Sequence, residues 1–79
     1  MNDIQNRLRL DKRNDGIMVS TIKAIAFAKY GEYETAISVD YGERWRICKG
    51  YNTKEEALEW HEKFLEMSQK ELLYFNFLE

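Results

Sequence analysis

A short phrase that occurs twice constrains this chain more than any other feature. Tyr30-Gly31-Glu32 recurs as Tyr41-Gly42-Glu43, and a segment of alternating apolar and polar residues follows each copy. Alternation with a period of two, interrupted by turns that contain glycine, is typical of an antiparallel meander. The sequence therefore predicts strands over 33–39 and 44–49. Residues 18–29, which contain several β-branched side chains, are predicted to form the strand before them.

The length limits how stable such a fold can be. The chain has 79 residues, 44% of them hydrophobic, which is enough for one small domain. A core of this size supports about 3–5 kcal/mol unless something else helps, and oligomerisation is one such help. The single Cys48 cannot close an intrachain disulfide. No apolar run is long enough to span a membrane, and the first residues are too polar for a secretory signal. We therefore expect a reducing, cytoplasmic setting without a membrane.

The turns decide which side of the meander is buried. A three-residue second loop, with Gly42 in the left-handed conformation, places Ile37 opposite Trp45 and Thr35 opposite Ile47. The same reasoning at Gly31 places Phe27 opposite Tyr33. The predicted core face comprises Val19, Ile25, Phe27, Tyr33, Ile37, Val39, Trp45, Ile47 and Tyr51.

The other face of the predicted sheet carries small side chains. They are Ala24, Ala26, Ala28, Ala36, Ser38, Cys48 and Gly50, and Glu34, Asp40, Arg44 and Arg46 lie at their margin. Such a flat surface has two interpretations. It is either a solvated face, or a surface that a partner, a second subunit or the N-terminal segment covers.

A helix is predicted to follow the meander. Thr53 and Glu56 form a capping box, so the helix begins at Lys54 and continues to about Lys70 or beyond. Its apolar side chains fall on two adjacent stripes, which would cover the core face of the sheet. The stripes are Ala57, Trp60, Phe64 and Met67, and Leu58, His61, Leu65 and Leu72.

The two ends of the chain leave alternatives open. Residues 1–17 form a short helix, a loose basic arm, or a strand over 7–12 that pairs with 18–23 through Asn14-Asp15-Gly16. The consecutive charges of Asp11, Lys12 and Arg13 favour the helix or arm. The apolar tail 72–78 either extends the helix or adds a strand, and it docks on its own domain or on a neighbour.

These patterns together predict an α+β fold. A three-stranded antiparallel meander packs against one long C-terminal helix in a domain over 18–79, and residues 1–17 are a short N-terminal extension. The sequence also predicts surfaces that bind a partner protein, with a homodimer as one form of that binding. The candidate residues are Glu34, Ala36, Ser38, Arg44, Arg46, Tyr74, Phe75 and Phe77.

Few residues of the chain are suited to catalysis. With one His and one Cys, soft or imidazole ligands cannot assemble a metal site. His61 lacks the second histidine of a zinc-protease helix, so we interpret it as a packed helix residue, and Cys48 as a structural thiol. A glycine-rich phosphate loop before a helix is also missing from the sequence. We predict no catalytic, cofactor-binding or metal-binding residues, and no enzyme activity.

Nucleic-acid binding is an alternative that the charge pattern disfavours. Arg44, Arg46 and Lys49 alternate with aromatic residues, as on a platform that stacks single-stranded bases. The predicted parity, however, turns Trp45 inward and the arginines outward. Residues 55–79 carry seven acidic and two basic groups, a net −5, within a chain of net charge −2. An acidic helix repels nucleic acid and suits a basic partner protein.

Three stretches together are similar to a group of small phage-encoded proteins of unknown function. They are Val19-Ser20-Thr21-Ile22, then Tyr33-Glu34-Thr35, then Tyr51-x-Thr53-x-Glu55-Glu56-Ala57 with His61. In that group a Val-Ser-Thr strand commonly opens the chain, whereas 17 residues precede Met18 here. Either this extension adds function or Met18 is the natural start. The resemblance implies a phage or prophage origin and the bacterial host cytoplasm, and it implies no catalytic residues.

The leading hypothesis is therefore an accessory protein that binds another protein, such as a host enzyme or a defence component. The alternatives are a nucleotide or nucleic-acid binding module that uses Arg44, Arg46 and Lys49, and a minor virion or assembly component.

Overall fold

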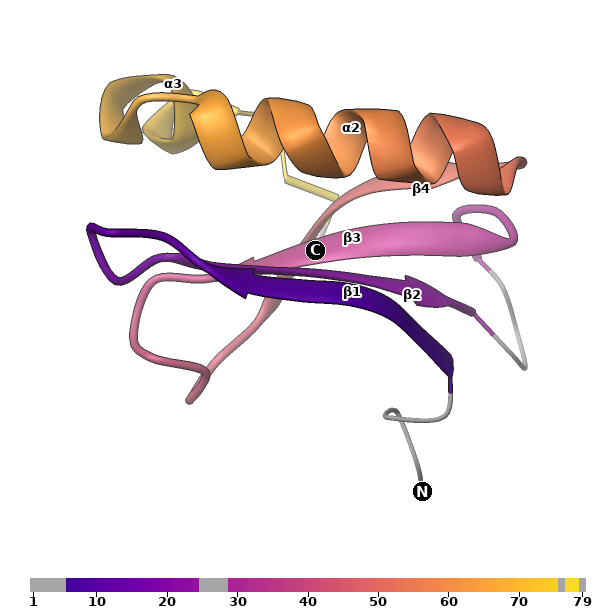
Figure 1. The fold of residues 1–79 in the computed structure, drawn as a ribbon, viewed down its shortest axis with the longest axis horizontal. Helices are drawn as coiled ribbons and strands as arrows, with labels where there is room; N and C mark the ends of the chain where they lie inside the picture. Colours follow the sequence, from indigo (N-terminus) through magenta and orange to yellow (C-terminus); the bar gives the residue numbers. More distant parts are fainter. Residues whose placement is uncertain (1–5, 25–28, 76, 79) are drawn as a thin grey trace.

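In the computed structural model, which describes residues 6–24, 29–75 and 77–78, four strands form one antiparallel sheet. They are β1 (Arg7–Lys12), β2 (Met18–Lys23), β3 (Tyr33–Ser38) and β4 (Arg46–Tyr51), arranged in that order. Helix α2 (Lys54–Glu66) lies across one face of the sheet, and α3 (Gln69–Leu73) follows it (Figure 1). The predicted α+β class is confirmed, with one strand more than the meander of three.

The additional strand is β1, which we had expected to be a helix or a basic arm. The alternative with a strand over 7–12 was the correct one. Gly16 has a φ of 88°, its N–H donates to the Arg13 carbonyl at 3.0 Å, and the Arg13 N–H donates to the Ile17 carbonyl at 2.8 Å. This turn pairs β1 with β2. The charges of the strand are tolerated because Arg9 meets Glu62 and Asp11 meets His61, both on α2.

The predicted parity holds in β2 and β3. Val19 pairs with Ile37, and both are buried, as is Tyr51 in β4. The two central strands therefore turn their odd-numbered residues toward α2. We call this side of the sheet the α2 face, and the other side the opposite face. Ile25 and Phe27 lie outside the described residues, but Tyr33 pairs with Lys23 and so does not face Phe27.

The predicted register of β4 was wrong. A bulge places Lys49 opposite Thr35 and Ile47 opposite Ala36, so Ile37 faces Arg46 and not Trp45. Cys48, assigned to the flat face, is buried in the core cluster. Ile47 lies beside Ala36 on the opposite face instead.

Two more residues of the predicted core lie outside it. Val39 is 71% exposed and Trp45 is 38% exposed. Both belong to the connection between β3 and β4, where the strand alternation has already ended at Ser38.

The start of α2 agrees with the prediction. Thr53 is the N-cap, and its hydroxyl accepts a hydrogen bond from the Glu56 N–H at 3.2 Å. Ala57, His61 and Phe64 are its buried residues, as the two stripes indicated. The helix ends at Glu66, earlier than expected, because Ser68 and Glu71 form a capping box that begins α3.

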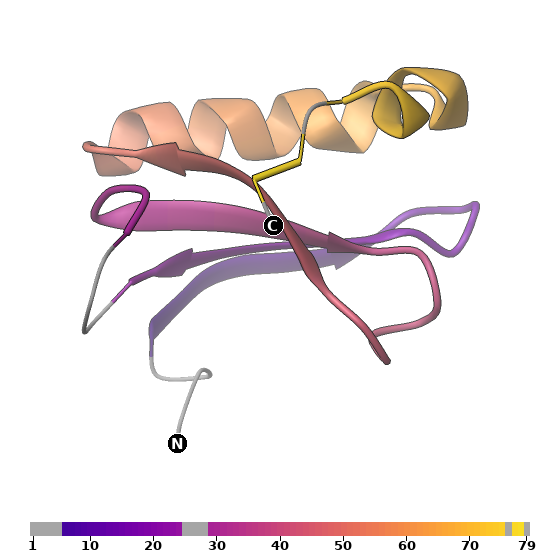
Figure 2. The same cartoon turned by 180° about the vertical axis from the view of Figure 1, so that it is seen from behind.

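The C-terminal tail docks on its own domain. Beyond α3 the chain crosses to β4, as Figure 2 shows from behind, and the Leu78 N–H donates to the Ile47 carbonyl at 2.8 Å. Phe75 packs on the buried ring of Phe64 at a centroid distance of 5.1 Å, and Phe77 also packs against the core. The tail therefore packs on the core cluster and meets β4 at Ile47.

The buried position of Phe64 leads to a stability prediction. Phe64→Ala should lower the free energy of unfolding by about 3–5 kcal/mol, because it removes a fully buried ring and leaves a cavity. Urea denaturation followed by circular dichroism measures the change. Trp45→Ala is the matched control, since this ring is partly solvent-exposed and should cost no more than about half as much. Equal losses in the two variants would contradict the assignment of the core.

Candidate functional site

A buried chain of hydrogen bonds links the sheet to α2. The His61 ring joins Asp11 on β1 through Nε2 at 2.9 Å and Thr21 on β2 through Nδ1 at 2.7 Å. Thr21 contacts Thr35 on β3 at 2.6 Å, and the Tyr51 hydroxyl on β4 donates to Thr35 at 3.0 Å. We call these five residues the polar chain. Every strand and α2 contribute one member to it.

One order of donors satisfies the whole polar chain. Tyr51 donates to Thr35, Thr35 to Thr21, and Thr21 to Nδ1 of His61, while the Nε2–H of His61 donates to Asp11. This order requires a neutral imidazole that carries its proton on Nε2. A second ring proton would turn Nδ1 into a donor and leave the Thr21 hydroxyl proton without its acceptor.

The electrostatics agree with a neutral ring. Burial lowers the pKa of His61, although the hydrogen bond to Asp11 acts in the opposite direction. That hydrogen bond lowers the pKa of Asp11, and the nearby Arg9 charge adds to the effect. Burial raises the pKa of Tyr51 to about 12. At neutral pH the polar chain therefore ends in a carboxylate at the surface and an un-ionised phenol in the core.

The arrangement of Asp11, His61 and Thr21 has the order of a catalytic acid, base and nucleophile. Thr21 and His61, however, have no exposed surface. A substrate cannot reach the Thr21 hydroxyl in this conformation, so we assign the polar chain a structural role. Cys48 is equally inert, since burial raises the pKa of its thiol to about 12.

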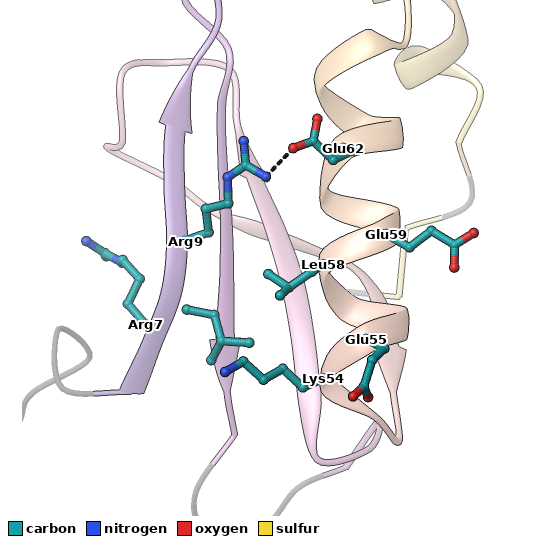
Figure 3. A pocket seen from close by; sticks show the side chains of 8 residues that line it. Arg7, Arg9, Lys54, Glu55, Leu58, Glu59 and Glu62 are labelled. Carbon is teal, nitrogen blue, oxygen red and sulfur yellow. Dashed lines mark hydrogen bonds and ion pairs between the residues drawn. The ribbon is translucent and has the colours of Figure 1, made fainter.

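An open groove runs between β1 and the first turns of α2 (Figure 3). Leu58 and Arg9 point into it, and an ion pair between Arg9 and Glu62 bridges its two walls, while Arg7 points away from the helix (Figure 3). The groove carries both signs of charge, and its full lining is Arg7, Leu8, Arg9, Lys54, Glu55, Leu58, Glu59 and Glu62. This mixture does not select anions or cations.

The connection between β3 and β4 displays exposed apolar side chains. Tyr41 is 73% exposed, and with Val39, Arg44 and Trp45 it forms what we call the loop patch. Hydrogen bonds within the loop hold it in place. The Ser38 hydroxyl accepts from the Gly42 N–H at 2.8 Å and donates to Asp40 at 2.8 Å, and Trp45 Nε1 donates to the Gly42 carbonyl at 3.0 Å.

Asp40 and Tyr41 fix the loop further. Asp40 accepts hydrogen bonds from the backbone N–H and from the guanidinium of Arg44. These bonds, the backbone one first, lower the pKa of the Asp40 carboxyl to about 2. Tyr41 has a φ of 59°, which a bulky residue adopts only when its surroundings require it. Its ring packs against Gly16, where a Cβ would come within 3.3 Å of it, and the Lys12 ammonium is 5.8 Å from the ring centroid. The loop patch is therefore presented in one conformation.

The structure does not bring the predicted partner-binding residues together. Glu34 and Ala36 lie on the opposite face beside Ile22 and Ser20, and Arg44 belongs to the loop patch. Ser38 is buried and bonded within the loop.

The remaining four lie near the C-terminal tail. The Arg46 guanidinium stacks on the Phe77 ring at 4.3 Å, and Phe75 and Phe77 pack on the core. Tyr74, next to Phe75, is 81% exposed.

Sequence reasoning missed the exposed apolar residues. Val39 and Trp45 were assigned to the core by parity, Tyr41 to a turn, and Leu10 to a helix or arm. A signal was present for Leu10, because Leu8 and Leu10 alternate with arginines just before an Asn-Asp-Gly turn. For the loop patch the corresponding signal is the cluster of polar and glycine residues over 38–43, which marks the end of strand alternation.

The described residues give no sign of a metal centre or a membrane span. Among them, no three His, Cys, Asp or Glu side chains gather as metal ligands would. In the same part of the chain, no helix has the length and apolar character to cross a bilayer. No protein-family model, curated protein or solved structure matches the chain.

The polar chain predicts the effect of removing one hydroxyl. Thr21→Val keeps the side-chain volume but leaves His61 Nδ1 without its donor and the Thr35 hydroxyl proton without its acceptor, so it should cost about 1–3 kcal/mol. Thr21→Ser retains the hydroxyl and is the control. Urea denaturation of both variants measures the difference. If Thr21→Val is as stable as the parent protein, the polar chain does not contribute to stability.

The lowered pKa of His61 predicts a dependence of stability on pH. Below about pH 6.5 the unfolded chain takes up a proton that the folded chain resists, so the free energy of unfolding falls as the pH decreases. Asp11 causes a further loss of stability at more acidic pH, because the pKa of its carboxyl is lowered in the folded state. Denaturation midpoints between neutral pH and about pH 5 test this. In His61→Gln the free energy of unfolding should depend less steeply on pH over this window. An unchanged slope would mean that other groups cause the pH dependence.

Proposed function

We propose that the protein acts by binding another protein, and that the loop patch is the main contact surface. The observation that carries this proposal is the combination of Tyr41, Trp45 and Arg44 on one exposed loop. Tyr, Trp and Arg are the residues most enriched at the energetic centres of protein interfaces. A loop that is already held by Ser38 and Asp40 loses little conformational entropy when a partner binds.

The class of partner follows from charge and from the sequence resemblance. Helix α2 exposes Glu55, Glu59 and Glu66, a surface that favours a basic protein over nucleic acid. The similarity to small phage proteins supports a partner from a bacterial host, such as an enzyme or a defence component in the host cytoplasm. The proposed role is that of an accessory protein which modifies the activity of that partner.

The cations that suggested nucleic-acid binding are arranged unfavourably for it. Arg46 stacks on Phe77, and the Lys49 ammonium lies 4.7 Å from the centroid of Trp60. Tyr51 is buried, so it is not available for stacking with bases. Arg44 lies apart from these residues in the loop patch, where it pairs with Asp40.

The proposal predicts a loss of binding when the loop patch is removed. Immobilised parent protein and a Tyr41→Ser/Trp45→Ser variant are exposed to lysate of a candidate host, and retained proteins are quantified by mass spectrometry. A specific partner should be retained at least about tenfold less by the variant. Tyr74→Ser is the control, since it removes an equally exposed tyrosine elsewhere. Circular dichroism verifies that both variants fold.

Two results would contradict the proposal. One is equal retention of every captured protein by the parent and the double variant. The other is tight binding of a labelled single-stranded oligonucleotide that weakens steeply with salt, which would favour the nucleic-acid alternative.

A further inference from the structure

We propose that the outer edge of β1 pairs with β1 of a second copy of this chain, around a two-fold axis at Leu10. The pairing joins two four-stranded sheets into one continuous antiparallel sheet. It gives the protein a second, self-recognising surface, which adjoins the loop patch where Lys12 lies near Tyr41.

The two edges of the sheet differ in what covers them. At β4 the tail meets the edge strand at Ile47, whose carbonyl accepts from the Leu78 N–H, and Phe77 packs against Arg46. At β1, in the part of the chain that the structure describes, β2 is the only strand paired with it. An uncovered edge exposes a row of unpaired backbone groups that another strand can extend.

The pairing with β2 shows which backbone groups of β1 point outward. The Arg13 N–H bonds to the Ile17 carbonyl, so this pair is a hydrogen-bonded one. Such pairs alternate along an antiparallel ladder, which makes Asp11–Val19 and Arg9–Thr21 hydrogen-bonded pairs as well. The N–H and carbonyl groups of Leu10 and Lys12 therefore point to the free edge. A second strand must pair with these residues.

The charges of β1 select one register for a copy of itself. With the axis at Leu10, the two Leu10 residues face each other, and Arg9 of each copy lies opposite Asp11 of the other. Moving the axis by one residue places Arg9 opposite Arg9, or Asp11 opposite Asp11. An axis at Lys12 places two lysines opposite each other. Like charges directly opposite are destabilising. Over residues 9–12, which pair with β2 without a bulge, the register at Leu10 avoids such pairs and is favoured.

The side chains that this register brings together are accessible. Arg9 and Asp11 are partly exposed on the α2 face, where they already form an ion pair with each other at 2.8 Å. A second copy extends that pair into a cluster of four alternating charges. Leu10 is 39% exposed on the opposite face, so the contact between two copies removes apolar surface from water. An axis of this kind uses the same patch on both copies and closes as a dimer.

The first measurement is the mass of the parent protein. Light scattering coupled to size exclusion, from micromolar to millimolar concentration, should show a rise from 9.5 kDa toward twice that value. A mass that stays at 9.5 kDa over the whole range overturns the proposal.

A pair of charge variants tests the register. Leu10→Lys and Leu10→Glu each place two like charges at the axis, so each alone should be monomeric, with association weakened at least about tenfold. A mixture of the two places opposite charges there and should recover the dimer. Variants that still dimerise alone place the interface elsewhere, and folded variants that fail to associate in the mixture exclude this register.

Two further variants separate the edge from the rest of the surface. Val39→Lys makes the same change at an exposed apolar residue that follows β3, two strands away from the free edge of β1, and should leave the dimer intact. Leu10→Pro removes an N–H that the ladder with β2 does not use, so it should abolish association and preserve the folded monomer. Thermal melts in circular dichroism verify folding. Dimerisation that persists in folded Leu10→Pro contradicts pairing through this edge.

Discussion

The polar chain from Asp11 to Tyr51 is the interaction on which the rest of the structure depends. Four strands and α2 each place one group in it, and its hydrogen bonds are complete in one donor order. The apolar cluster around it is small, with Phe64 as its largest buried member. Each unsatisfied group in such a core would cost about 1–3 kcal/mol, a large share of the total stability of a small domain. The polar chain therefore adds to apolar packing in excluding shifted registers of the strands.

The polar chain also shows where prediction from sequence ends. Local signals identified the parity of β2 and β3, the Thr53 cap and the buried side of α2, because alternation and capping depend on neighbouring residues. The strand β1 was missed because its charges argued against burial. What makes Asp11 acceptable there is His61, fifty residues further along the chain. The register of β4 failed for a similar reason, since a bulge opposite Thr35 lets Cys48 enter the core and shifts the parity of every residue before it.

The candidate site was predictable only in outline. The flat face was inferred from unbroken strands, but the chain leaves the sheet at Ser38, whose hydroxyl bonds to Asp40 and Gly42 and begins the loop. Val39 and Trp45 are therefore exposed on the surface, although large apolar side chains of this kind are typical of a core. The tail shows the converse. Phe75 and Phe77 were predicted to bind a partner, and they pack against the core cluster of their own domain.

The two edges of the sheet illustrate two ways in which a small domain can satisfy the unpaired backbone groups of an edge strand. The contact at β4 requires the residues after α3, whereas pairing β1 with a copy of itself requires no additional chain. The residues that select the register of that pairing, Arg9 and Asp11, are the ones that hold β1 to α2 through Glu62 and His61. The docking of β1 on the helix therefore fixes the guanidinium and the carboxylate before a second copy arrives. Asp11 belongs both to the polar chain and to the edge of β1. The interactions that hold it in the monomer therefore also position it at the surface through which we propose that two monomers meet.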